Sequence, residues 1–258
     1  VRVTDDTVLV PLTLQMKNKD ITFAEKEGIE RGVVNISGRV STLTGKIAQT
    51  FEDTVRVDVP KELLPKVTEN ANVYWKAMPL RPGRYRIDIV VKDVNGDRLG
   101  TWRNSINVPN MSEDAGLTSS TLILADQMER VPAKSIGTGN FVIGSTKVRP
   151  RVESGDKPVS FKRDQKMNFW MQVYNLGIDQ QTKKADAVFE YSIVDTKTNK
   201  PVVQTSETTA QLGAGEEVTL EKSLPLGALQ PGSYQLTVKV DDKVSKQPLV
   251  RQAKFTVE

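Results

Sequence analysis

A twelve-residue pattern occurs twice in this chain and limits what it can fold into. LRPGRYRIDIVV occupies residues 80–91 and LQPGSYQLTVKV occupies residues 229–240, and both copies keep Leu, Pro-Gly and Tyr in the same places. After each Tyr, apolar and polar residues alternate, which is typical of an antiparallel strand with one face in water. The repeat therefore predicts that one β unit occurs twice.

Two further pairs of segments match in the same order along the chain. TLTGKIAQT at 42–50 resembles TKTNKPVVQT at 196–205, and each joins two strand-like stretches through a turn with Gly or Asn. LTLQMKN at 12–18 lines up with FWMQVYN at 169–175, with apolar residues at alternate positions in both. Matches in the same order along both halves indicate that the chain is a tandem duplication.

Each copy of the twelve-residue pattern places a tyrosine just after Pro-Gly. In a Greek-key sandwich, Pro and Gly make the corner turn, and the tyrosine buries its ring while its hydroxyl bonds to nearby backbone. We predict this structural role for Tyr85 and Tyr234. Because the corner explains both residues, the alternative role of a catalytic phenol is not favoured.

The predicted fold class is all-β, with two tandem immunoglobulin-like antiparallel β-sandwich domains. We expect the first domain at 1–109, a linker at 110–119 and the second domain at 120–258. The first residues, VRVTDDTVLV, have no initiator Met and no signal peptide and resemble the inside of a strand. We therefore expect a piece of a longer protein, and an N-terminally incomplete first domain is one alternative.

Composition excludes several classes of function. The chain has no His and no Cys, so His-activated nucleophiles are excluded and zinc, copper and iron lose their usual ligands. Its 36 Lys and Arg residues are nearly balanced by 32 Asp and Glu residues, which does not indicate nucleic-acid binding. No apolar stretch reaches the roughly 20 residues of a membrane helix. We expect no enzyme activity, no cofactor and no transmembrane segment in this chain.

The turn after the first copy of the pattern is the one candidate cation site. In DVNGD, residues Asp93, Asn95 and Asp97 have the spacing that opens a calcium-binding loop. The match then fails, because Arg98 stands where Gly is needed and Asn104 where the bidentate Glu is needed. An Asn-Gly hairpin turn explains the same residues, so calcium binding and a simple turn remain alternatives, with the turn favoured.

An aromatic pair distinguishes the second copy from the first. In 12–18, the positions out of phase with the apolar ones hold Thr, Gln and Lys, as a wet face requires, whereas the second copy has Trp170, Gln172 and Tyr174 there. This face could bind a sugar or an apolar partner. The alternative, which we favour, is an internal seam covered by the strand-like segment 121–131 or by the first domain.

Several segments together resemble a known bacterial family. LRPGRYRIDIVVKDVN, SSTLILADQMERV, FVIGSTKVRPRV, FWMQVYNLGID and LPLGALQPGSYQLTVKV, in this order, resemble the C-terminal region of large uncharacterised bacterial proteins that carry a GWxTD motif. The GWxTD motif itself is absent, since Trp102 lies in LGTWRNS. The resemblance implies β-sandwiches that follow another domain, and an extracytoplasmic (periplasmic, secreted or envelope-associated) location. It implies no catalytic or binding residue.

These observations predict a non-catalytic module of a larger secreted or envelope-associated protein, with a structural or protein-binding role. Its expected partners are another protein or the remaining domains of the parent protein. A polysaccharide-binding sandwich that uses the aromatic face is the alternative, followed by a calcium-dependent adhesion module.

Overall fold

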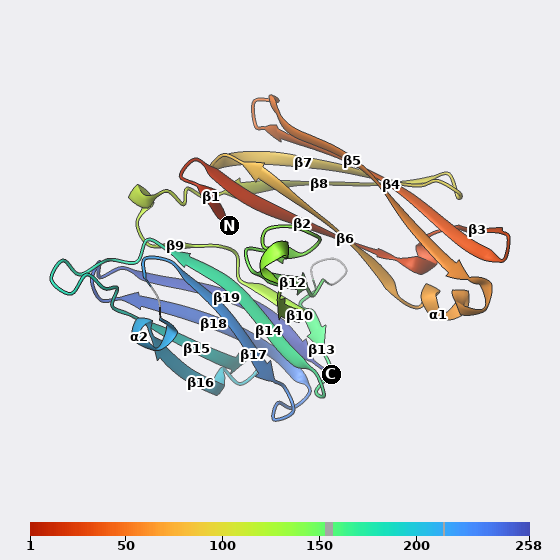
Figure 1. Ribbon diagram of the computed structural model, residues 1–258. Coiled ribbons are helices and arrows are strands. Elements are labelled where there is room, and N and C mark those ends of the chain that lie inside the picture. Colours follow the sequence, from red (N-terminus) through yellow and green to blue (C-terminus); the bar gives the residue numbers. More distant parts are fainter. Residues whose placement is uncertain (153–156, 214) are drawn as a thin grey trace. The chain divides into compact units, whose positions relative to one another are not determined.

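The computed structural model describes residues 1–152, 157–213 and 215–258. The chain is almost entirely β-structure and divides into two compact units (Figure 1). The first unit is Asp6–Asn110, and the second unit is Met111–Glu258 together with Val1–Asp5. The first five residues thus belong to the second unit, whereas the sequence led us to expect them in the first domain.

The first unit contains a five-stranded antiparallel sheet in the order β3-β4-β7-β8, with β5 also paired to β4. Strands β2 and β6 pair antiparallel in its second layer, a sheet of order β1-β2-β6. The strands are β2 Thr7–Lys17, β3 Phe23–Lys26, β4 Ile29–Thr42, β5 Ile47–Pro60, β6 Ala71–Leu80, β7 Gly83–Asp93 and β8 Arg98–Val108. The short helices are η1 Asn18–Asp20, η2 Lys61–Leu63 and α1 Leu64–Thr68.

The first unit's core follows the strand alternation of the sequence. Ile36 of β4 and Ile87 and Ile89 of β7 are almost completely buried, as is Met78 of β6. The polar residues between them face the other side of the sheet, as the period of two requires.

The second unit is a sandwich of two larger sheets. One has the order β11-β12-β10-β14-β17 with β9 paired to β14, and the other has the order β13-β19-β18-β15-β16. The first comprises β9 Thr118–Ser119, β10 Ile123–Arg130, β11 Val142–Ile143, β12 Thr146–Pro150, β14 Lys166–Tyr174 and β17 Val218–Pro225. The second comprises β13 Val159–Phe161, β15 Ala187–Asp195, β16 Lys200–Thr208, β18 Gly232–Asp242 and β19 Pro248–Val257. The remaining elements are β1 Arg2–Thr4, η3 Glu113–Ala115, η4 Ala133–Ser135 and α2 Thr209–Leu212.

Side chains from both sheets make one core in the second unit. Phe169 and Met171 of β14 are fully buried together with Phe189 of β15 and Leu236 and Val238 of β18. This arrangement is compatible with the expected immunoglobulin-like sandwich. Among the residues that the structure describes, no helix is long and apolar enough to cross a membrane.

Both predicted tyrosine corners are confirmed. The Tyr85 hydroxyl donates a hydrogen bond to the carbonyl oxygen of Arg81 at 3.0 Å, and the Tyr234 hydroxyl donates one to that of Gln230 at 2.7 Å. Both side chains are buried, with 7% and 3% of their surface exposed. Each hydroxyl therefore satisfies a carbonyl four residues earlier and closes the Pro-Gly turn at the start of its strand.

Candidate interaction strand

Strand β8 lies at the edge of the first unit's five-stranded sheet and is the most exposed long strand of that unit. All residues from 98 to 105 are exposed, Ile106 is half-buried, and only Val108 is buried. Leu99 is 67% exposed and Trp102 is 45% exposed. Among the described residues, β8 pairs only with β7, so the backbone N–H and C=O groups of its second edge pair with no other strand.

Two apolar side chains of β8, one exposed and one half-buried, lie on the core side of the sheet. Trp102 is opposite Ile89 and Ile106 is opposite Tyr85 in the β7–β8 register, and Ile89 and Tyr85 are both buried. Side chains of directly opposed residues point to the same face. Trp102 is nevertheless 45% exposed. The core side of the sheet is therefore open along β8.

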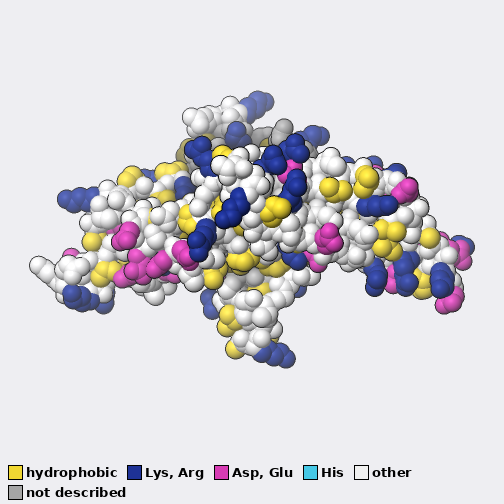
Figure 2. Space-filling model, turned by 90° about the horizontal axis from the view of Figure 1, so that it is seen from above, with side chains coloured by type: hydrophobic (Ala, Val, Ile, Leu, Met, Phe, Trp, Pro, Cys, Tyr) yellow, Lys and Arg dark blue, Asp and Glu magenta, His cyan; other side chains and the backbone are white. Residues whose placement is uncertain are grey.

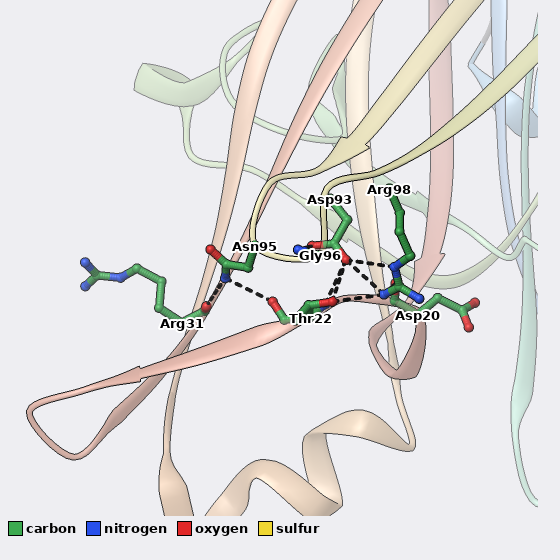
Figure 3. A network of polar contacts seen from close by, with 7 residues as sticks. All are labelled: Asp20, Thr22, Arg31, Asp93, Asn95, Gly96 and Arg98. Atoms are coloured by element: carbon green, nitrogen blue, oxygen red, sulfur yellow. Dashed lines mark hydrogen bonds and ion pairs between the residues drawn. The ribbon is translucent and has the colours of Figure 1, made fainter.

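A polar network fixes the start of β8 (Figure 3). The Asp93 carboxylate, at the end of β7, accepts hydrogen bonds from the Thr22 backbone N–H at 3.1 Å and the Thr22 hydroxyl at 2.7 Å. It also forms an ion pair of 2.9 Å with Arg98, the first residue of β8. The same guanidinium donates to the carbonyl oxygen of Asp20 at 2.9 Å. These contacts tie the β7–β8 turn to the segment that follows β2.

The electrostatics of Asp93 follow from this network. Burial of its carboxyl group works to raise its pKa, but the hydrogen bonds from Thr22, Arg98 and the Gly96 backbone outweigh burial, so the pKa is held below its ordinary value. Asp93 is therefore ionised at neutral pH, and its charge is matched by Arg98.

The candidate calcium residues form a turn rather than a common coordination site. Asn95 donates its side-chain amide to the carbonyl oxygens of Thr22 and Arg31, at 3.0 and 2.7 Å. Asp97 forms an ion pair of 2.9 Å with Lys92 instead of joining Asp93. Among the described residues, no group of three or more acidic side chains is placed to hold a metal ion. The hairpin turn is therefore the alternative that this geometry favours.

The predicted aromatic face of the second unit is not exposed. Trp170 is 1% exposed and packs against Ala125 of β10 and Ile143 and Val148 of β11 and β12, with Val1 beside them. The hypothesis that this face is exposed for binding is therefore wrong, and the alternative that other segments cover it is correct. The cover includes segment 121–131, because β10 pairs with β14 and places Ile123 opposite Trp170.

Tyr174 is covered by the N-terminal segment. Its hydroxyl accepts a hydrogen bond from the Arg2 backbone N–H at 3.1 Å and donates one to the side chain of Gln172 at 2.6 Å. The Arg2 guanidinium lies 5.2 Å from the centre of the Tyr174 ring. Burial raises the pKa of Tyr174 to about 12. Trp170, Gln172 and Tyr174 thus form an internal seam and cannot act as a stacking platform.

Sequence reasoning did not identify β8 as a site. The sequence left undecided whether Trp102, which aligns with Arg251, is buried. A signal was present, because the last strand of the first copy has Trp102 and Asn104 where the second copy has Arg251 and Ala253. Whether such a strand is covered depends on distant segments, which alternation within the strand does not reveal.

Charge on the surface is mixed. In the space-filling view, Lys and Arg side chains lie among acidic and hydrophobic ones (Figure 2). Arg98 and Arg103 of β8 are ion-paired with Asp93 and Asp88 of β7. The two positive charges of β8 are thus partly neutralised within the sheet.

The sequence matches no protein-family model and no curated protein. Among solved structures, the β-glucuronidase of Bacteroides uniformis matches with a TM-score of 0.33 and 12% identity, over 98% of this chain and 26% of that chain. Bacteroides uniformis β-glucuronidase 2, covalently bound to cyclophellitol-6-carboxylate aziridine, matches with a TM-score of 0.30 and 11% identity, over 97% of this chain and 26% of that chain. This chain thus spans about a quarter of their length, and TM-scores this low transfer neither a site nor an activity.

Proposed function

We propose that this chain is a non-catalytic β-sandwich module that binds a protein partner by strand addition along β8. The observation that carries the proposal is the exposure of β8 along its free edge together with the 45% exposure of Trp102 on the core side. In strand addition, an extended segment supplies main-chain hydrogen bonds to an open edge, and alternate side chains supply specificity.

The form of β8 supports this role. Its eleven residues pair with β7 in one unbroken register, without a bulge, and none of them is proline. Edge strands that avoid pairing are usually short, bulged, interrupted by proline or lined with unpaired charges. Both arginines of β8 are held by acidic residues of β7. An added strand would therefore meet a regular edge with little unpaired charge.

Two further aspects belong to the same proposal. The absence of His and Cys and the structural use of both corner tyrosines support a non-catalytic role. The GWxTD-type sequence resemblance supports a place in a larger bacterial protein outside the cytoplasm. The polysaccharide alternative loses its basis, since its aromatic face is buried.

The outward-facing N–H groups of β8 can be located by comparison with β19. In the second unit, the backbone N–H of Glu258 points to the outer edge of β19, because it donates to Phe161 of β13 at 3.0 Å. Backbone direction alternates along a strand, and the two corners are matched in sequence. Counted from the corner tyrosines, the outward-facing N–H groups of β8 include those of Ser105 and Asn107. The Ser105 N–H donates to the side-chain oxygen of Asn104 at 2.8 Å, so an added strand would replace this local partner.

Panning a library of random displayed peptides on the full chain tests the proposal. We expect enriched peptides to bind the chain but not the Ser105→Pro variant, which removes one outward N–H group, whereas Ser105→Ala should bind as the original does. Peptides that bind all three proteins equally would place the interaction elsewhere and overturn the assignment to β8. Failure to enrich any peptide would also count against it.

A further inference from the structure

The second unit contains a strand at the position that is open in the first unit. There β13 pairs with β19 in parallel, with Val159 opposite Phe255 and Phe161 opposite Val257. Phe161 is 1% exposed and meets Phe255 edge-to-face, with ring centres 6.3 Å apart. A short parallel strand thus closes the core beside the tyrosine corner of the second unit.

The corresponding position of the first unit has no such strand among the described residues. Ile106 follows Tyr85 by as many residues as Phe255 follows Tyr234, and each is paired with its corner tyrosine. Phe255 is fully buried, whereas Ile106 is only half-buried. No described strand covers Ile106 in the way that Phe161 covers Phe255.

The segment that matches β13 in the first copy lies in the other unit. Aligning LTLQMKN with FWMQVYN places Arg2–Thr4, which is β1, at the position of β13. Yet β1 pairs with β2 rather than with β8, and Arg2 bonds to the Tyr174 hydroxyl and, at 3.0 Å, to the side chain of Asn175. Val3 is 57% exposed and fills no core position. The duplication therefore leaves one strand position of the first unit vacant among the described residues.

We propose that β8 accepts an extended peptide segment that adds in parallel, with apolar side chains opposite Ile106 and Val108. This inference rests on the proposed function and specifies its partner. An aromatic or β-branched side chain at these two positions would cover the half-buried Ile106, as Phe161 covers Phe255. Polar residues between them would face water, because side chains alternate along a strand.

One residue limits the register. Pro109 stands where the second unit has Glu258, so the last N–H group of that ladder is missing in the first unit. The added strand must then take its hydrogen bonds from Ser105 and Asn107 and extend back toward Trp102. A strand that reaches Trp102 would bury its indole, so binding would change the fluorescence of Trp102.

A labelled peptide of residues 157–163, KPVSFKR, is the probe, because it contains β13 itself. We expect it to bind the full chain, shift Trp102 emission to shorter wavelength, and lose about tenfold in affinity when Phe161→Ser is introduced in the peptide. Methylation of its backbone amides should abolish binding without changing the protein. Binding that survives both changes would overturn strand addition by this peptide.

Direction is tested by disulfide trapping, because the chain has no native cysteine. Parallel addition in this register predicts that a cysteine in place of Lys157 of the peptide links to Asn104→Cys, and that one in place of Arg163 links to Asn110→Cys. The reverse pattern would show antiparallel addition and overturn the inference while leaving the proposed function intact. Pairing of the chain with a second copy of itself through β8 would likewise overturn the inference and leave the proposed function intact. If the panned peptides also do not bind at β8, the proposed function itself is wrong.

Discussion

Asp93 and Asp242 hold the same position in the two units and make the same kind of contact. Each lies eight residues after its corner tyrosine, at the end of its strand, and each is buried. Asp93 accepts a hydrogen bond from the backbone N–H of Thr22, and Asp242 accepts one from that of Gly177 at 2.8 Å. These amides follow β2 and β14, the strands that the repeat matches. A buried aspartate therefore ties equivalent loops together in both units.

Asp93→Asn is expected to destabilise the chain by about 1–3 kcal/mol at pH 7, because charge-assisted hydrogen bonds are lost in a buried site. The pKa of Asp93 is lowered on folding, so its stabilising effect is present above the ordinary carboxyl pKa of about 3.9 and disappears as pH falls through the folded-state value. The urea midpoints of the original chain and of the Asp93→Asn variant should therefore converge at acidic pH. Asp97→Asn, whose side chain is 86% exposed, is the control and should leave the midpoint unchanged.

Tyr85→Phe and Tyr234→Phe are each expected to lower the free energy of unfolding by about 1 kcal/mol, the usual net value of one hydrogen bond. The two losses should add, because the two corners lie in separate units and share no partner. Urea denaturation of the single and double variants measures both effects. Unchanged midpoints would contradict the corner assignment.

Gly38→Ala is expected to destabilise the first unit by about 1–3 kcal/mol through overpacking. A Cβ atom at Gly38 of β4 would overlap the ring of Phe51, which is opposite it on β5. Gly100→Ala on β8 is the matched control, since a Cβ atom there meets nothing within 4 Å. Equal thermal midpoints for the two variants would show that the Phe51 ring moves aside freely.

A chain with Trp75→Phe and Trp102→Phe retains Trp170 as its one indole. Its emission should be blue-shifted and poorly quenched by iodide or acrylamide, because Trp170 is 1% exposed. Restoring Trp102 should add a component that iodide quenches readily. Red-shifted, quenchable emission from Trp170 alone would contradict the buried seam.

Millimolar calcium is expected to leave the thermal midpoint unchanged. The Asp93 carboxylate is bound by Thr22 and Arg98, and Asp97 is paired with Lys92, so binding a cation would require breaking these contacts. The check is a melting curve with calcium against one with a chelator. A midpoint several degrees higher in calcium would show that the turn rearranges into a cation site.

The sequence alone determined the all-β class and both tyrosine corners. These features depend on short-range patterns: alternation with period two, Pro-Gly before tyrosine, and a hydroxyl that reaches a carbonyl four residues earlier. The β7–β8 turn was only partly determined by sequence, since its positive φ falls at Asp97 and its side chains bond to Thr22 and Arg31 outside the hairpin.

Only the tertiary structure decided which faces and edges are covered. Trp170 has the pattern of an exposed position, yet β10, β12 and Val1 cover it. Trp102 stays partly exposed because no described strand lies beyond β8. β1, the segment that aligns with β13, is grouped with the second unit, where Arg2 bonds to Tyr174. Alternation along a strand determines which face of the sheet each side chain occupies. Whether that face is buried depends on contacts between segments far apart in the chain, which no short-range pattern records.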